Sequence, residues 1–365
     1  MDILFDENST KSVVELSAET VKDLALEEIV ECITRGDSEK KIIRGIFTKI
    51  PTDLEDIRYR QEILKDFMEN EVLVEELAEV LEQIKTLKEY ADMKPAMMNQ
   101  EQSLYVLLEK LRELSVYVNV AENIVNCLKK HKPASVGLKR VWEQLETIVR
   151  DEHFLQAKED IQIMLGELSN VRGAMVAVNF TPDLNIEQVT AIEFVPHRLR
   201  SKYKLAEFAS SMHNVINTGA ATGSSGGRMV TTRVIDPLLA TMTPHIEKHL
   251  KKHFTKIRQI MMKYVKMDGV SITEMYEGLT FYLAMSRFGQ RLGREGYDIC
   301  MPDLTEASGT FEIKDLYNVR LFFAGEKNIV KNDFCFTPKE NLYILTGPNR
   351  GGKTIIEQSL GIISV

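Results

Sequence analysis

The sequence predicts a mainly α fold: a core and lever bundle of long helices, a small β-containing insertion, and then the truncated N-terminal part of an α/β domain with a phosphate-binding loop. Three observations support this fold class. Apolar residues recur at three- and four-residue steps over long stretches, which is the period of an α-helix. Aromatic residues make up only 7% of the 365 residues, and 16 are Met, a composition that favours helices over stacked sheets. A glycine-rich run near the end of the sequence follows an apolar segment, as phosphate-binding loops do.

Composition and charge exclude several classes of protein. A hydrophobic content of 44% with 20 Gly and 10 Pro excludes a disordered or collagen-like chain. The length suggests about two or three domains. Four cysteines without a C-x-x-C pair indicate reduced thiols and no cysteine-based metal site. No apolar run approaches the ~18 residues of a membrane span, and the first ten residues are acidic, unlike a signal peptide. We therefore expect a cytoplasmic protein with no membrane partner.

Residues 1–170 are expected to form the helical core and first lever. Two short helices should precede Pro51, the second with Ser38 as its N-cap, and Thr52 with Glu55 should open a third as a capping box. Longer apolar stripes then predict bundle or coiled-coil helices, with a break near Pro95. These stripes cover residues 73–87, 104–128 and 136–168.

Residues 173–235 are expected to form a small insertion that contains a β-hairpin. Two runs with alternating apolar residues, 174–180 and 189–195, flank a turn with Pro and Asp. The glycine- and serine-rich run 219–227 has the composition of a flexible loop. Residues 236–296 then predict returning lever helices, one to about residue 267 and one from about residue 272.

The segment from His197 to Lys266 is strongly basic. It holds 13 Lys and Arg against 3 Asp and Glu, net +10, whereas the rest of the chain has 33 against 51, net −18. One interpretation is a polyanion contact confined to this segment. The other is a solvated helix face whose counter-charges come from neighbouring elements. His245, His249 and His253 share one helix face there, but the lysines between them disfavour a metal site.

The most informative run matches G-x-x-x-x-G-K-[ST], the Walker A pattern of P-loops. Its residues are Gly347, Pro348, Asn349, Arg350, Gly351, Gly352, Lys353 and Thr354. A run that we expect to be a buried strand, residues 341–346, precedes it, and residues 355–360 can begin a helix. Lys353 would lie on the β- and γ-phosphates of ATP, and the Thr354 hydroxyl would bind Mg²⁺. The alternative is a glycine-rich turn that binds nothing.

Residues 297–365 would then be the start of a P-loop ATPase domain. Only eleven residues follow Thr354, whereas the carboxylate that holds Mg²⁺ in such domains lies on a later strand. We therefore expect this chain to be a fragment that hydrolyses ATP poorly or not at all, although the full-length protein would be an ATPase. Catalytic residues stay unassigned, because the acidic Glu193 lies too far upstream to serve.

The run TGPNRGGKT, with Asn349 and its double glycine, resembles the nucleotide loop of MutS-type DNA mismatch-repair ATPases. Asn332-Asp333 falls where that family approaches the loop, and residues 56–61 resemble the opening of its helical core. Two positions depart from the family pattern: Arg350 replaces an apolar residue, and Ile329 stands where many members stack an aromatic ring on adenine. The chain begins almost at the core, so recognition of mismatches through the family's N-terminal wedge is not expected.

The resemblance implies a DNA-binding ATPase of DNA repair or recombination control that uses ATP and Mg²⁺ and acts as a homodimer. ATP binding would be coupled through the helical levers to a basic, clamp-like tip that holds duplex or branched DNA through its phosphates. Nucleotide contacts would include Ile329 and Asn332 as well as the loop. The DNA contacts would be Arg198, Arg200, Lys202, Lys204, Arg228, Lys248, Lys251 and Lys252. The alternatives are a coiled-coil scaffold with a structural nucleotide loop that binds RNA, ribosomes or acidic partners, and, ranked lower, a chromosome-maintenance ATPase of the SMC type.

Overall fold

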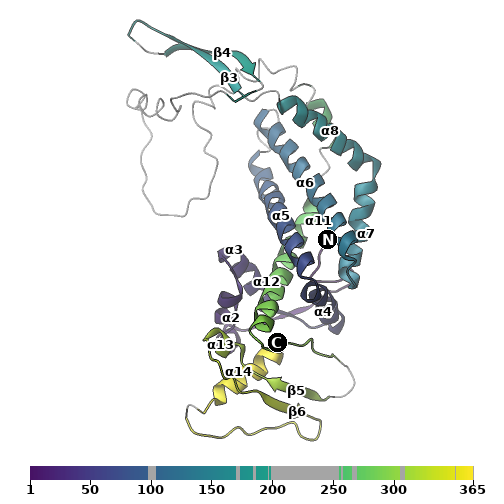
Figure 1. Ribbon diagram of the computed structural model, residues 1–365, viewed down its shortest axis with the longest axis vertical. Helices are drawn as coiled ribbons and strands as arrows, with labels where there is room; N and C mark the ends of the chain where they lie inside the picture. The colour runs from purple at the N-terminus through teal and green to yellow at the C-terminus, as the bar shows by residue number, and fades with distance from the viewer. Residues whose placement is uncertain are drawn as a thin grey trace. The chain divides into compact units, whose positions relative to one another are not determined.

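The computed structural model is mainly helical (Figure 1). It describes residues 1–97, 104–169, 173–183, 186–195, 197–198, 255, 258–264, 269–304, 309–349 and 351–364. The chain divides into two compact units, which are described separately below. The first unit comprises Met1–Asp92, Val116–Asp151 and Asp268–Val365, and the second comprises Met93–Ser115 and Glu152–Met267.

The helices and strands of the first unit include most of those that periodicity predicts. Its helices are α1 (Ala18–Asp23), α2 (Leu26–Ile33), α3 (Asp37–Phe47), α4 (Leu54–Glu69), α7 (Val136–Arg150), α11 (Val270–Thr273), α12 (Met275–Arg294), α13 (Val319–Phe323) and α14 (Lys353–Ser364), with most of α5 (Glu71–Met97) and the second half of α6 (Leu104–His131). Its strands are β1 (Val13–Glu15), β2 (Lys49–Pro51), β5 (Phe311–Leu316) and β6 (Asn332–Phe336).

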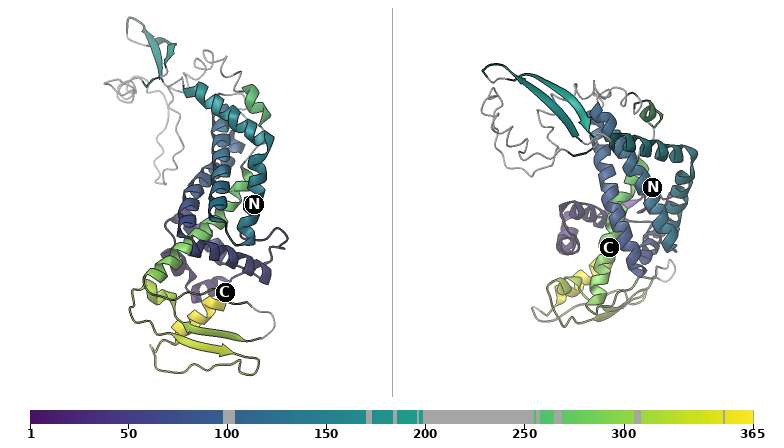
Figure 2. Two further views of the ribbon diagram at one scale, coloured as in Figure 1. Left: turned by 45° about the vertical axis from the view of Figure 1, so that its right-hand side comes forward. Right: turned by 45° about the horizontal axis from the view of Figure 1, so that its top comes forward.

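The core of this unit is built around α12, which lies against α4, α3 and α2 (Figures 1 and 2). Phe67 of α4 and Tyr282 of α12 are fully buried, with ring centroids 5.5 Å apart. The buried Ser286 hydroxyl donates to the Phe67 carbonyl oxygen at 3.0 Å, so the polar group on this face is satisfied. Burial of these rings supplies much of the hydrophobic stabilisation that joins α4 to α12.

The N-terminal segment, residues 1–11, is part of the same core. Ile3 is fully buried, and its carbonyl oxygen accepts a hydrogen bond from the Tyr282 hydroxyl at 2.9 Å. A Cβ at Gly278 would lie 2.4 Å from Ile3 Cγ1, so the segment reaches this depth only because α12 has no side chain there.

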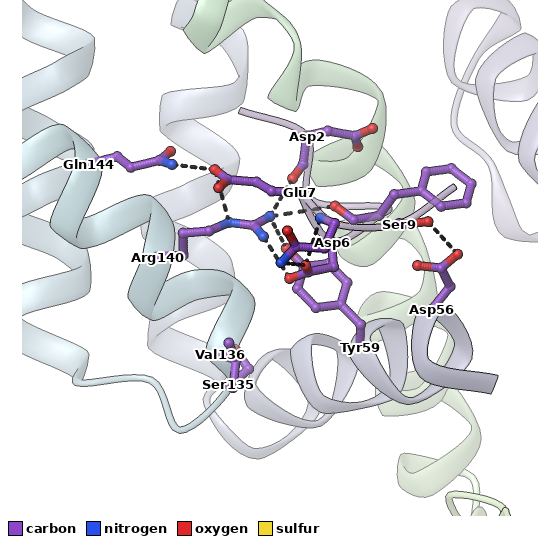
Figure 3. A network of polar contacts seen from close by, with 12 residues as sticks. Asp2, Asp6, Glu7, Ser9, Asp56, Tyr59, Ser135, Val136, Arg140 and Gln144 are labelled. Carbon is purple, nitrogen blue, oxygen red and sulfur yellow. Dashed lines mark hydrogen bonds and ion pairs between the residues drawn. The ribbon is translucent and has the colours of Figure 1, made fainter. Parts of the chain in front are cut away.

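Arg140 of α7 ties this segment to the helices (Figure 3). Its guanidinium donates to Asp6 Oδ2 at 2.8 Å, to the Asp2 carbonyl oxygen at 3.1 Å and to the Tyr59 hydroxyl at 2.6 Å. Burial raises the pKa of Tyr59 to about 12, although the Arg140 charge acts in the opposite direction. Tyr59 therefore stays a neutral phenol that accepts from the guanidinium, and one arginine joins α7, α4 and the N-terminal segment.

Several local expectations were wrong at helix ends. Asp53, not Thr52, is the N-cap of α4, and its carboxylate accepts from the Glu55 amide at 2.9 Å. Gly36, not Ser38, precedes α3. Neighbouring Ser, Thr and Asp residues compete for the same capping role, so sequence places a cap only to within a residue or two. Helix α5 continues past Pro95 to Met97, and the residues after it lie outside the described part.

The stripe 136–168 forms two helices, not one, because Asp151 leaves the helical conformation at φ −64°, ψ 138°. Helix α7 ends at Arg150, and α8 runs from Glu152 to Ser169. The pairing of β1 with β2, in which Val13 faces Pro51, was not predicted from the sequence. Each of these strands has three residues, too few to show a period of two.

The second unit contains α8 and the predicted hairpin. Strands β3 (Gly173–Phe180) and β4 (Ile186–Val195) pair antiparallel, which confirms the hairpin. On α8, Asp160 accepts a hydrogen bond from the Tyr264 hydroxyl at 2.6 Å, and Lys263 Nζ lies 3.4 Å from the same carboxylate. Most of the long helix expected from residue 236 lies outside the described residues. Within the described ranges, every helix is too short or too polar to cross a bilayer.

Candidate functional site

The glycine-rich run 347–352 leads directly into α14, which begins at Lys353, two residues before the start expected from the sequence. Gly352 has φ +81°, in the left-handed region that favours glycine, and this conformation turns the chain into the helix. The first turn of a helix has backbone N–H groups without intrahelical acceptors and a partial positive charge. Such an end binds anions, phosphate among them.

Lys353 is folded back onto this loop. Its ammonium donates to the carbonyl oxygens of Gly347 at 2.7 Å and Pro348 at 2.8 Å. The Gly351 amide donates to the Pro348 carbonyl oxygen at 3.1 Å, which closes the turn. The positive charge therefore lies at the mouth of the loop, beside the N-terminus of α14. Thr354 is exposed at the same end, and Arg350 lies outside the described residues.

Within the first unit, hydrogen bonds from several elements hold helix α14 in place. The Gln358 amide donates to the Asp23 carbonyl oxygen at 2.8 Å, and the Asn318 amide donates to the Ile355 carbonyl oxygen at 2.9 Å. Arg320 of α13 donates to Gln358 Oε1 at 2.8 Å. A Cβ at Gly361 would lie 2.4 Å from Leu24 Cδ2, so α14 packs closely on Leu24, the C-cap residue of α1. The end of α14 that carries the loop is therefore held in a defined place.

The buried strand expected at 341–346 is not present. This segment has no regular secondary structure, and its apolar side chains are exposed: Leu342 to 79% and Ile344 to 81%. It is held by Tyr343, whose hydroxyl donates to the Cys335 carbonyl oxygen at 2.7 Å and whose ring lies 4.8 Å from that of Phe336. A strand requires ladder hydrogen bonds to a neighbour, and no described strand pairs with this segment.

The sheet beside the loop is the antiparallel pair β5–β6, in which Phe311 faces Phe336. Three two-stranded antiparallel sheets occur among the described residues, and the parallel sheet of a P-loop ATPase domain is not among them. Asn332 opens β6, and its amide lies 3.5 Å from the Val330 carbonyl oxygen. Ile329 is half-buried. In the described part of the chain, no hydrogen bond joins Asn332 to the loop.

Most of the expected DNA contacts lie outside the described residues. Arg198 is described and is exposed just after β4. The other expected DNA contacts lie outside the described residues: Arg200, Lys202, Lys204, Arg228, Lys248, Lys251 and Lys252. The three histidines considered as a metal site, His245, His249 and His253, also lie outside them.

A side-chain cluster that the sequence analysis missed joins α5 to α6. Glu76, Cys127 and His131 present their polar atoms within 4.8 Å of one another. The Asn70 side-chain oxygen accepts from the Leu73 amide at 3.0 Å, so its NH₂ group faces His131 Nδ1, also at 3.0 Å. Nδ1 is therefore an acceptor, and Nε2–H donates to Glu76 Oε2 at 3.1 Å.

This arrangement does not fit a metal site. A metal on His131 Nε2 would move the ring proton to Nδ1, against the Asn70 NH₂ group. Burial raises the pKa of Cys127 to about 12, so its sulfur is a thiol and not the thiolate that metals bind. The cluster is a structural contact between two helices. From sequence, only the i, i+4 spacing of Cys127 and His131 on a predicted helix hinted at it.

Comparison with known protein families gives a match in the helical part of the chain. Residues 52–188 match the family model of the MutS2 N-terminal domain. The matched region includes α4, α7, α8 and residues 56–61, where the sequence resembled the opening of the MutS core. A search of curated proteins gave no match. This match places residues 52–188 in the MutS family, in its MutS2 branch.

Proposed function

We propose that this chain is part of a DNA-handling ATPase in which ATP and Mg²⁺ bind at residues 347–354. Nucleotide binding is coupled through the long helices to the basic segment 197–266, which holds DNA through its phosphates. The observation that carries the proposal is the position of the Lys353 ammonium, on the Gly347 and Pro348 carbonyl oxygens at the start of α14. A polyphosphate competes well for such a cation, because charge-assisted hydrogen bonds to phosphate are stronger than those to neutral carbonyls.

The proposal assigns a role to each part of the site. Backbone N–H groups of residues 351–354 contact the phosphates, Lys353 lies on the β- and γ-phosphates, and the Thr354 hydroxyl binds Mg²⁺. The match of residues 52–188 to the MutS2 N-terminal domain supports ATP as the ligand and DNA as the partner. Residues that activate water are not assigned, so the proposal concerns binding and not the rate of hydrolysis.

Lys353→Ala is expected to weaken the Mg²⁺-dependent component of ATP binding at least about tenfold, because it removes the charge at the loop mouth. The measurement is a titration with a fluorescent ATP analogue, with Mg²⁺ and with EDTA in its place. Lys339→Ala is the matched control, since Lys339 is an exposed lysine of the preceding segment. Equal Mg²⁺-dependent affinity in both variants, or none in the unaltered chain, contradicts the proposal.

Replacing Arg198, Arg200, Lys202 and Lys204 together with Glu is expected to weaken binding to a short DNA duplex and to flatten its salt dependence. If all four contact phosphates, the slope of log affinity against log salt concentration falls in magnitude by about 3–4. Electrophoretic mobility shifts from 50 to 200 mM salt measure this slope. Four exposed lysines elsewhere, Lys22, Lys65, Lys129 and Lys339, replaced with Glu give a control of equal net charge. An equal loss in the control shows that net charge, not this segment, determines binding.

A further inference from the structure

A basic cleft of about 590 Å³ lies in the first unit, lined by the N-terminal segment, α3, α5 and the start of α12. Among the described residues, six cationic side chains line it, against two acidic ones, Glu89 and Glu277. The six are Lys11, Lys41, Lys49, Arg60, Lys85 and Lys88. This excess of positive charge belongs to a chain with a net charge of −8, and it lies outside the basic segment 197–266.

Half of these cations are already engaged within the protein. Lys11 pairs with Asp2 at 2.8 Å, and Lys88 lies 3.6 Å from Glu277. Arg60 donates to the Leu4 carbonyl oxygen at 2.8 Å, and its guanidinium carbon lies 4.5 Å from the centroid of the Phe5 ring. Burial lowers the pKa of Arg60, which shows that this cation lies in a partly desolvated part of the wall.

The other three cations, Lys41, Lys49 and Lys85, are exposed and have no ion pair among the described residues. They come from three separate elements of the lining, α3, β2 and α5. Like charges that share a cleft repel one another, and a bound anion relieves this repulsion. Because three separate elements supply them, they suit a ligand with more than one anionic group.

The rest of the lining is apolar or aromatic. Leu4 and Tyr276 are buried, while Phe5, Ile42 and Ile46 are half-buried. Gly45 of α3 is exposed on this wall, and a Cβ there would meet no atom within 4 Å. A glycine inside a helix costs about 1 kcal/mol relative to alanine, and here it keeps the wall open. The ligand therefore has an apolar part as well as its charges.

We propose that this cleft binds a nucleoside polyphosphate, at a site distinct from residues 347–354. The phosphates contact Lys41, Lys49 and Lys85, and the base lies on the apolar lining. The volume is within the range of small-ligand sites, about 300–1,000 Å³, and suits one nucleotide rather than a strand of several. The binding does not depend on Mg²⁺, because lysines instead of a metal neutralise the phosphates.

The test uses the full chain carrying Lys353→Ala, in EDTA, so that the loop at 347–354 does not contribute. ATP and GTP are titrated by calorimetry, each compared with inorganic tripolyphosphate and with a twelve-residue oligothymidylate. We expect saturable binding of at least one nucleotide with 1:1 stoichiometry, at least about tenfold tighter than tripolyphosphate. Lys41→Gln with Lys85→Gln should weaken it about tenfold or more.

The matched control is Lys65→Gln with Lys129→Gln, which removes the same charge from two exposed lysines outside the cleft. Its nucleotide affinity should stay within about twofold, and thermal midpoints of both double variants should match that of the parent. Three results overturn the proposal: no saturable nucleotide binding, equal loss in both double variants, or tripolyphosphate binding as tightly as the nucleotides. Tighter binding of the oligothymidylate that is lost on changing Lys41 and Lys85 would instead identify a site for single-stranded nucleic acid.

Discussion

Arg140→Met is expected to lower the free energy of unfolding of the first unit by about 2–4 kcal/mol. The side chain of Arg140 is only 17% exposed, and its guanidinium bonds Asp6, the Asp2 carbonyl oxygen and the Tyr59 hydroxyl (Figure 3). Methionine keeps the apolar part of the side chain but leaves the Asp2 carbonyl and the buried Tyr59 hydroxyl without this donor. The Asp6 carboxylate is about one-third exposed, so water can hydrate it once the arginine is gone. The loss of stability is therefore smaller than for a fully buried ion pair.

The expected loss corresponds to a fall of roughly 4–16 °C in the thermal midpoint of this unit. Hydrogen exchange gives a second, local measurement. The substitution should increase the exchange rates of the amides of residues 1–11 more than those of α12, each compared with the unaltered chain. Arg150→Met is the matched control on the same helix, because Arg150 is 71% exposed and its ion pair among the described residues is with Glu146, at i, i+4. Its effect should stay within about 0.5 kcal/mol. Equal effects of the two substitutions would show that the Arg140 network does not hold the N-terminal segment.

The elements that sequence predicted well are those determined by local pattern. The stripes that became α5 and α6 and the runs that became β3 and β4 each carry their periodicity within one segment. The helix after the glycine-rich loop was likewise predicted, from residue 355, and it begins two residues earlier, at Lys353. What failed depends on distant partners: β1 needs β2, and the segment 341–346 is a strand only where another strand pairs with it.

The candidate sites divide in the same way. The Walker pattern lies within eight consecutive residues, so sequence alone identifies it and singles out Lys353 as its cation. The basic cleft draws Lys11, Lys41, Lys49 and Lys85 from four separate segments, and none of them is unusual in its own neighbourhood. Only the packing of α3, α5 and the N-terminal segment around α12 brings those charges together. The same holds for Arg140, which looks like an ordinary surface arginine in the sequence.

Phe67→Ala is expected to lower the free energy of unfolding of the first unit by about 3–5 kcal/mol, the largest stability effect that we predict. The Phe67 ring is fully buried against Tyr282, so its removal leaves a cavity between α4 and α12. Neighbours cannot easily fill the space, because Ser286 is bonded to the Phe67 carbonyl oxygen and Tyr282 to that of Ile3. Chemical denaturation monitored by helix content measures the loss.

Val72→Ala is the control for Phe67→Ala, since Val72 lies near the start of α5 and is exposed on the same unit; its effect should stay within about 0.5 kcal/mol. Phe67→Leu refines the test, because leucine fills much of the space and should recover more than half of the loss. If Phe67→Ala and Phe67→Leu lower the free energy of unfolding equally, the loss comes mainly from the ring contact with Tyr282 and not from the cavity. A cost near that of Val72→Ala would mean that α4 does not pack on α12 through this ring, and the hydrophobic core described for the first unit would be wrong.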